Sequence, residues 1–285
     1  MTKLKKSYIA LLTSLIVLNF PVYADSGQSI NIKVKQTDFT KNMIKVDGGS
    51  FIMGSIEPEA YRWELPAHNV RLDDFYISKY EVSQKEYLSL VGINPSYFTG
   101  ENLPVERVSW FDAIKYCNLI SEKEGLAVAY NPLTGELLDE YGMVTQDVRK
   151  VKGYRLPTEA EWEFAARGGN KSKKYKYSGS DDINEVGWYS ENSLSQTFDI
   201  GMKKANEIDL HDMSGNVWEW CTDSYGVYSI DNMINPYISK KVSGKVGRGG
   251  SWDSDIKDIR TSVRLFLKDS YNLDYIGFRI ARTSN

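Results

Sequence analysis

The chain has 285 residues, of which 41% are hydrophobic and 13% are aromatic. This length and composition suffice for one sizeable hydrophobic core, or at most two domains. The formal net charge is -3, and it becomes more negative if the lysine-containing N-terminal segment is removed. A mildly acidic chain argues against nucleic acid or an anionic membrane as the main partner.

The N-terminal segment has the pattern of a secretory signal peptide. Three lysines lie within the first six residues, and an apolar run follows from Tyr8 to Phe20. Small residues then precede a cleavage position after Ala24. An uncleaved membrane anchor is the alternative, but the run is short for spanning a bilayer. Because no cysteine follows the run, a lipoprotein anchor is disfavoured, and we expect a periplasmic or secreted protein that is not membrane-bound after cleavage.

The rest of the chain divides into a polar segment and one continuous domain. Residues 25–41 show neither helical nor strand periodicity, which predicts a linker or an edge strand. We expect residues 42–285 to form a single domain. Short β-prone runs near Gly and Asp, at 51–54 and 75–77, predict strands or extended segments.

Helix starts are marked by capping boxes, in which a Ser or Thr is followed three residues later by an acid. Apolar residues at helical spacing follow each box. Much of the chain beyond Gly168 shows neither the helical nor the strand pattern of apolar residues, yet it is rich in Trp, Tyr, Gly and Asn. The residue pattern alone therefore predicts a loop-rich α+β fold, with helices beginning at Ser83-x-x-Glu86, Ser109-x-x-Asp112 and Thr158-x-x-Glu161.

Several blocks combine Gly, Trp and paired acidic and basic residues, and together they resemble the formylglycine-generating enzyme family, also called the sulfatase-modifying factor domain. The resemblance implies a C-type-lectin-like α+β fold with few short strands, about three helices and long ordered loops. It runs from Met43 to the end of the chain. The blocks that carry it are Met43–Gly54, Gly153–Gly169, Gly215–Trp220, Arg248–Trp252 and Gly277–Arg279.

Oxygen-bearing groups follow one another closely between Asp212 and Glu219. Calcium takes several carboxylate and carbonyl oxygens on a bent backbone. The family binds calcium with this segment, so the resemblance implies Asp212, Gly215, Val217 and Glu219 as ligands. As an alternative, Asp212 caps a turn and Glu219 pairs with an arginine.

A second family calcium site resembles the segment around Asn192 and Ser193. Asn192 would supply its amide oxygen and Ser193 its carbonyl, while Asp199 is the candidate for the downstream acid. Transition-metal sites are not indicated, because the only histidines, His68 and His211, lack ligand spacing.

Active members of the family bind copper through two cysteines between the Gly-Gly-Ser and Gly-Phe-Arg blocks. Here the stretch from Trp252 to Ile276 contains no cysteine. Ser254 and Ser262 lie near the expected positions, but a hydroxyl cannot replace a thiolate on Cu(I). Ser251 matches a family active-site serine without an identifiable base. We therefore expect no copper, and whether the chain has any enzymatic activity stays open.

Two cysteines, Cys117 and Cys221, lie elsewhere, beside aromatic residues. Buried free thiols and a disulfide in an oxidising compartment are both open, with free thiols favoured.

The segment between Trp252 and Phe278 is predicted to be a recognition surface held by these two rings as buried anchors. Its polar and aromatic residues supply adaptable hydrogen bonds and rigid contacts. Arg260 and Arg264 are expected to pair internally with acids. The predicted ligand-binding residues are Ser251, Trp252, Asp253, Ser254, Asp255, Tyr271, Asn272 and Tyr275.

Three functions remain open from the sequence. The first is a formylglycine-generating oxidase acting on a sulfatase cysteine, which the missing cysteine pair opposes. The second is a binding module for a protein or peptide, including the retroelement-diversified type that varies this same segment. The third is a periplasmic maturation factor without copper chemistry. We favour an exported, calcium-stabilised binding or maturation factor.

Overall fold

The structure is a computed structural model that describes residues 41–239 and 244–284. The predicted signal peptide (1–24) and nearly all of the predicted linker (25–41) lie outside the described residues. Within the described ranges, no helix is both long and apolar enough to cross a membrane.

Capping side chains start three helices where the sequence predicts them. In each, the hydroxyl of Ser83, Ser109 or Thr158 accepts a hydrogen bond from the backbone N–H three residues on, and the acid at that position reaches back. These paired bonds satisfy N–H groups that the first helical turn leaves unpaired. The helices are α1 (Gln84–Val91), α2 (Trp110–Lys123) and α3 (Glu159–Ala166), followed by the short α4 (Ile183–Val186). Single 3-10 turns lie at Arg62–Glu64, Val148–Lys150 and Gly169–Lys171.

The strands are short and form small sheets. β1 (Met43–Val46), β4 (Phe75–Ser78) and β10 (Ala281–Thr283) make one antiparallel sheet. A second joins β2 (Gly49–Met53), β3 (His68–Leu72) and β6 (Met233–Ile234). A third has the order β8-β7-β5-β9, with β5 (Trp218–Ser224), β7 (Gly244–Arg248), β8 (Arg264–Lys268) and β9 (Ile276–Gly277).

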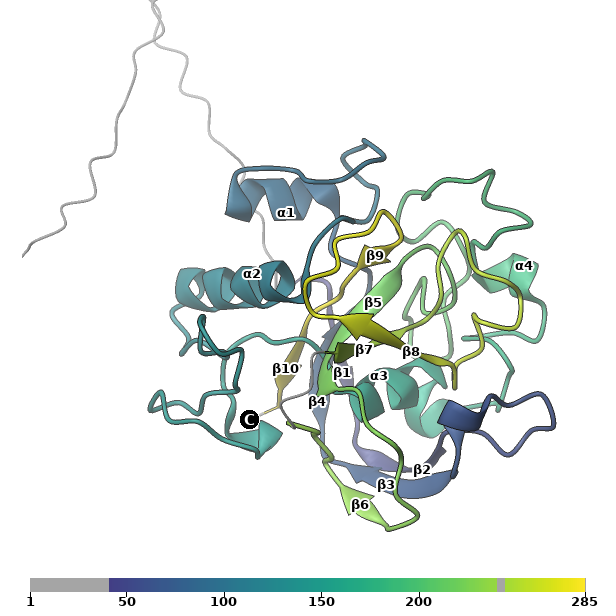
Figure 1. Ribbon diagram of the computed structural model, residues 1–285, viewed down its shortest axis with the longest axis horizontal. Helices are drawn as coiled ribbons and strands as arrows, with labels where there is room; N and C mark the ends of the chain where they lie inside the picture. Colours follow the sequence, from purple (N-terminus) through teal and green to yellow (C-terminus); the bar gives the residue numbers. More distant parts are fainter. Residues whose placement is uncertain (1–40, 240–243, 285) are drawn as a thin grey trace, which may run out of the picture. The chain divides into compact units, whose positions relative to one another are not determined.

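Burial follows the place of each strand in its sheet. On β3 the residues alternate between buried and exposed, as expected for a strand with one solvated face. β5 lies between β7 and β9, and all of its residues are buried. β5 is therefore a fully buried inner strand of this sheet (Figure 1).

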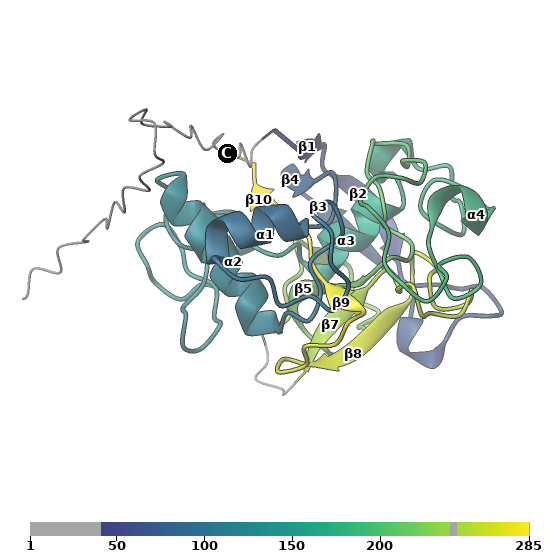
Figure 2. The ribbon, with the colours of Figure 1, turned by 90° about the horizontal axis from the view of Figure 1, so that it is seen from above.

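Two hydrophobic clusters flank this sheet. In one, α1 and α2 lie side by side (Figure 2) and their Tyr87 and Tyr116 rings pack with Phe278. In the other, α3 contributes Trp162 and Phe164, which pack with residues of β1 to β5. The predicted loop-rich α+β fold is confirmed, and its long loops end on these clusters.

Candidate functional site

An open groove of about 550 Å³ lies beside the start of β8. Its walls come from the loop before β3, from the start of β5, from the segment after Gly250 and from the start of β8. Segments far apart in the sequence thus meet in one place. The lining residues are Tyr61, Trp63, Trp218, Ser251, Asp253, Ser254, Asp255, Asp258, Val263, Arg264, Leu265 and Tyr275.

The groove combines carboxylates with aromatic rings. Asp253 and Asp255 are exposed, and Asp258 accepts a 2.9 Å hydrogen bond from the Tyr61 hydroxyl. Burial, together with this bond to a carboxylate, raises the pKa of Tyr61. The Tyr61 and Trp63 rings stack with centroids 4.7 Å apart, and Trp63 is 46% exposed. The arrangement suits a partner with positive charge and aliphatic surface.

Ser251 and Ser254 form the polar floor of the groove. The Ser254 hydroxyl accepts a hydrogen bond from the Ser251 N–H (2.9 Å), and the two hydroxyl oxygens are 3.1 Å apart. Both residues are buried, although both line the groove. Within the described chain, the contacts of the Ser251 hydroxyl are Ser254 and the Asp253 N–H. A nucleophile needs an adjacent base, and these contacts supply none.

Both arginines that were expected to pair internally do so. Arg260 forms two bonds to Glu64, at 2.9 and 2.7 Å. Arg264 forms two bonds of 2.6 Å to Glu159, so its charge is neutralised although it lines the groove. Paired forks of this kind fix geometry as well as charge. The prediction for Arg260 and Arg264 is confirmed.

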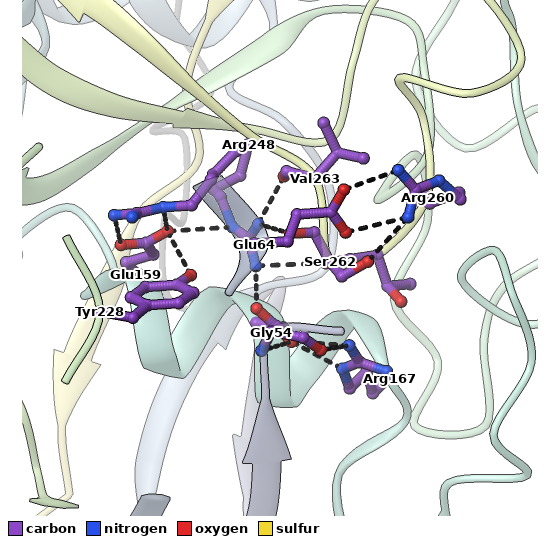
Figure 3. Close-up of polar contacts among 12 residues, drawn as sticks. Gly54, Glu64, Glu159, Arg167, Tyr228, Arg248, Arg260, Ser262 and Val263 are labelled. Carbon is purple, nitrogen blue, oxygen red and sulfur yellow. Dashed lines mark hydrogen bonds and ion pairs between the residues drawn. The ribbon is translucent and has the colours of Figure 1, made fainter. Parts of the chain in front are cut away.

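A third buried arginine, Arg248 of β7, lies next to Ser262 and Val263 (Figure 3). It donates to the carbonyl oxygens of Thr261, Ser262 and Val263 and pairs with Glu163 of α3. The backbone from 261 to 263 therefore depends on one guanidinium that is fully buried.

Other predicted ligand residues lie away from the groove lining. Tyr271 and Asn272 are exposed at the turn after β8. Phe278 is a buried anchor as expected, whereas Trp252 is only partly buried. The Trp252 ring N–H donates to the Asp274 carbonyl (3.1 Å), and the ring packs edge-on to Phe98. Trp252 thus braces the segment from its outer side.

The implied calcium segment brings buried acids together. Glu81, Asp212 and Glu219 are all buried, and the Arg279 guanidinium lies among them. Burial and the negative charges of Asp212 and Glu219 raise the pKa of Glu81 well above its usual range. Burial likewise raises the pKa of Asp212 to about 6. The carboxyl groups here outnumber the single guanidinium, and burial favours the protonated forms of Glu81 and Asp212.

The carboxylate oxygens of Asp212 and Glu219 are nevertheless largely engaged. Both Glu219 oxygens accept 2.7 Å bonds from Arg279, and one also accepts the Trp162 ring N–H. One Asp212 oxygen accepts the Gly201 N–H (2.7 Å), while the other has no partner among the described residues. Calcium takes six to eight oxygens, and the described residues contain no cluster of three acid, His or Cys side chains that could hold a metal. The alternative of an arginine partner for Glu219 matches the geometry, and calcium at this segment stays a prediction.

The second implied calcium segment forms a hydrogen-bonded turn. The Asn192 amide oxygen accepts the Tyr189 N–H (2.9 Å), and its amide donates to the Gly187 carbonyl. The Ser193 hydroxyl donates to the Trp252 carbonyl (2.8 Å). The Ser193 bond ties the turn to the recognition segment, and calcium at Asn192, Ser193 and Asp199 stays a prediction.

The cysteines lie in separate hydrophobic clusters. Cys117 belongs to the cluster under α1 and α2, and Cys221 to the cluster around α3. Both are buried free thiols, and neither lines the groove. Burial raises the pKa of both thiols well above their usual range, which disfavours thiolate chemistry.

Sequence reasoning found one wall of the groove and missed the other. Tyr61 and Trp63 were not singled out, although they complete the site, whereas Asp258 lies in the segment predicted as a recognition surface. The available signal was the Tyr-x-Trp pair within an aperiodic, acid-rich loop. Its distance from the C-terminal blocks hid its role.

Known proteins resemble the whole described domain. The chain matches the sulfatase-modifying factor enzyme 1-like domain family over residues 29–284. It is 38% identical to chaperone protein LppX of Paenibacillus barcinonensis over 85% of this chain and 89% of that protein. It is 25% identical to formylglycine-generating enzyme of Thermomonospora curvata, over 86% and 94% of the two chains.

A solved structure agrees with this assignment. Treponema denticola variable protein 1 superposes with a TM-score of 0.74 and 30% identity, covering 85% of this chain and 95% of that one. The chain therefore belongs to the sulfatase-modifying factor, or formylglycine-generating enzyme, family.

Proposed function

We propose that this protein is an exported accessory factor that binds an extended, positively charged segment of a partner protein in the groove beside β8. One observation carries the proposal: residues singled out from the sequence line a groove in which Asp253 and Asp255 are exposed beside stacked rings. A relative named as a chaperone, 38% identical over most of its length, supports a role in protein interaction.

The charge argument rests on which groups are already neutralised. Arg264, the basic residue of the lining, is paired with Glu159. Asp253 and Asp255 have no salt bridge among the described residues. A lysine or arginine of a partner would meet these carboxylates, and its aliphatic stem would lie on the Trp63 and Tyr275 rings.

A defined peptide pair tests the proposal. A fluorescein-labelled hexapeptide of alternating lysine and valine should bind, and the glutamate-valine counterpart should not. Replacing both Asp253 and Asp255 with Asn should weaken binding about three- to tenfold, since each exposed ion pair contributes up to about 1 kcal/mol. Added salt should weaken wild-type binding.

The matched control replaces two exposed acids outside the groove, Glu122 and Glu140, with Gln. Fluorescence anisotropy should give this variant the wild-type Kd. Equal binding of the two peptides, or an unchanged Kd in the Asp253/Asp255 variant, would contradict the proposed groove.

Export is part of the proposal and rests on the N-terminal pattern alone. N-terminal sequencing of the protein from its host should give Asp25 as the first residue. Recovery of Met1 on soluble cytoplasmic protein would remove export from the proposal.

Calcium remains a prediction drawn from the family. If calcium binds at Asp212, then it should raise the melting temperature and a chelator should lower it, because a ligand bound by the native state alone stabilises it. Asp212→Asn should abolish the difference. A wild-type melting temperature that ignores calcium and chelator would agree with the Arg279 pairing of Glu219 and reject the site.

The family's oxidase activity is the alternative, and the chemistry of the groove opposes it. Ser254 lines the groove and Ser262 contacts Arg260, and neither hydroxyl can act as a soft ligand for Cu(I). Incubation with Cu(I) and a cysteine-containing sulfatase peptide, followed by mass spectrometry, should leave the cysteine intact.

A diversified recognition surface is a second candidate. The segment from Ser251 to Asp258 forms a groove wall, and a neighbour of 30% identity is named a variable protein. Sequencing the gene from many isolates should then show changes concentrated at Asp253, Asp255 and Asp258, with Arg260 constant. Changes scattered evenly along the gene would reject diversification.

A further inference from the structure

The third sheet leaves one strand edge without a partner. β8 stands at the end of the order β8-β7-β5-β9 and pairs with β7 from Arg264 to Lys268. Within residues 41–239 and 244–284, no other strand or isolated bridge pairs with β8. An open edge carries unpaired N–H and C=O groups that another chain can use.

This edge has few of the features that usually block such pairing. Between Arg264 and Lys268 there is no proline, and the pairing with β7 runs without a register shift. Phe266 is 44% exposed. Natural proteins protect open edges with prolines, bulges or short length, and β8 offers only the exposed Lys268 at its far end.

The groove lies against this same strand. Arg264 and Leu265 at the start of β8 line it, together with Val263 just before the strand. Successive strand residues point to opposite faces of a sheet, and the Arg264 side chain is turned inward onto Glu159. A groove on one face of the sheet would be lined by every second residue of the strand. Because neighbouring residues line this groove, we infer that it runs along the edge of the strand. A chain lying in the groove would therefore lie next to the open backbone of β8.

We propose, building on the function proposed above, that the partner segment binds as an added β-strand along the free edge of β8. Its backbone pairs with β8, and alternate side chains reach the groove. There the basic side chains meet Asp253 and Asp255, as the charge of the groove requires. β8 spans five residues, or about 17 Å at about 3.4 Å per residue, so it accommodates a segment of about that length.

Backbone methylation of the probe tests this pairing. In an antiparallel pair, only alternate residues of the added strand direct their N–H and C=O groups toward the neighbour. Two versions of the lysine-valine hexapeptide are made. One is N-methylated at its lysines and the other at its valines, so each blocks one of the two alternating sets of backbone N–H groups. One of the two methylated peptides should bind at least about tenfold more weakly than the parent peptide, because it loses several strand hydrogen bonds of about 1 kcal/mol each. The other should stay within about threefold of the parent peptide.

Hydrogen exchange supplies the second readout on the unmodified protein. Peptide at saturating concentration should slow exchange of amides between Arg264 and Lys268, while amides of α1 serve as the internal control. Exchange is compared at two protein concentrations without peptide. Protection that grows with protein concentration alone would assign the edge to a second copy of this chain and overturn the proposal.

The outcomes separate strand addition from the proposed function. If the parent peptide binds and depends on Asp253 and Asp255, but both methylated registers bind equally, then the groove function stands and strand addition is wrong. If the parent peptide does not bind, both proposals fail. Register-selective loss together with protection of β8 supports both.

Discussion

At the scale of single residues, this domain depends on arginines that are buried with their acids. The Arg279–Glu219 and Arg260–Glu64 pairs join residues far apart in the sequence, and all four side chains are almost fully buried. A buried charge whose partner is removed has no solvent to replace it. These pairs therefore hold the loops in one arrangement, whatever their net contribution to stability.

We expect Glu219→Gln to lower the free energy of unfolding by about 3–5 kcal/mol, because Arg279 then remains buried with its charge uncompensated. Urea denaturation measures the change. The control is Glu101→Gln, which breaks the exposed pair with Lys85 and should alter stability by at most about 0.5 kcal/mol. If Glu219→Gln changed the free energy of unfolding by as little as the control does, Arg279 would be paired with water or with another acid in the variant.

A second residue-scale prediction concerns Glu106. Burial raises its pKa to about 7, so the native state holds a proton that the unfolded chain releases near pH 4.5. Where the native state binds more protons, stability falls as pH rises. The contribution of Glu106 is thus fully present below about pH 4.5 and is lost as pH rises toward about 7.

Glu106→Gln should flatten this decline, since the amide does not titrate and its oxygen can still accept the Phe98 N–H that Glu106 accepts now. Denaturation curves at a series of pH values between 4 and 8 test the slope. The exposed Glu140→Gln is the control. Identical slopes for wild type and Glu106→Gln would mean that another buried acid, such as Asp223, governs the dependence.

The sequence was informative about residue types and much less so about their partners. It offered an arginine as one alternative for Glu219, and it predicted internal pairing of Arg260 and Arg264. It could not name Glu64 or Glu159, because ion pairs between distant segments leave no local periodicity. The acids of the groove were found where they follow the Gly-Gly-Ser block, whereas Tyr61 and Trp63 lie in an earlier loop without such a marker.

At the scale of elements, local chemistry predicted where helices begin and tertiary contact decided the rest. The capping boxes at Ser83, Ser109 and Thr158 start α1, α2 and α3. By contrast, β9 and β6 have two residues each, too short for any alternating pattern to show. Their pairing follows from the loops that deliver them, so the sheet orders could not be predicted from the sequence.

The loop carrying Tyr61 and Trp63 begins at Gly54, which has φ of 87° and whose N–H donates to Glu163. A Cβ there would lie 2.4 Å from the Glu64 carbonyl oxygen. Gly54→Ala should therefore displace this groove wall, weaken peptide binding and accelerate proteolysis of the loop. The measurements are the peptide Kd and limited proteolysis.

Gly92→Ala is the matched control for that substitution. Gly92 has φ of 86° at the C-terminus of α1, and a Cβ there would meet nothing within 4 Å. Both variants carry the left-handed backbone strain of about 1 kcal/mol, but only Gly54→Ala adds a clash beside the groove. Equal peptide Kd values for the two variants would contradict a role for the Gly54 turn in shaping the site.

At the scale of the whole domain, one chain of mostly buried charges connects the helix α3 to two sheets and to the groove. Arg167, Glu163 and Arg248 follow one another, and Glu159 with Arg264 lies alongside (Figure 3). Glu163 also accepts the Gly54 N–H at the end of β2. The end of β2, the strands β7 and β8, and the 261–263 backbone thus converge on two glutamates of one helix.

Because these segments converge on Arg248, we expect the shape of its guanidinium to affect both stability and the groove. Arg248→Lys tests this expectation. A lysine keeps the charge but lacks the planar fork that now reaches Glu163 and three successive carbonyls. We expect the free energy of unfolding to fall by about 3 kcal/mol or more, as when a buried pair is broken. The peptide Kd should also rise, because Val263 and Arg264 line the groove. Arg149→Lys, in an exposed pair with Asp147, should change neither. If Arg248→Lys lowered stability while peptide affinity stayed the same, the 261–263 backbone would keep its shape without these bonds, and the charge network would hold the core together without shaping the groove.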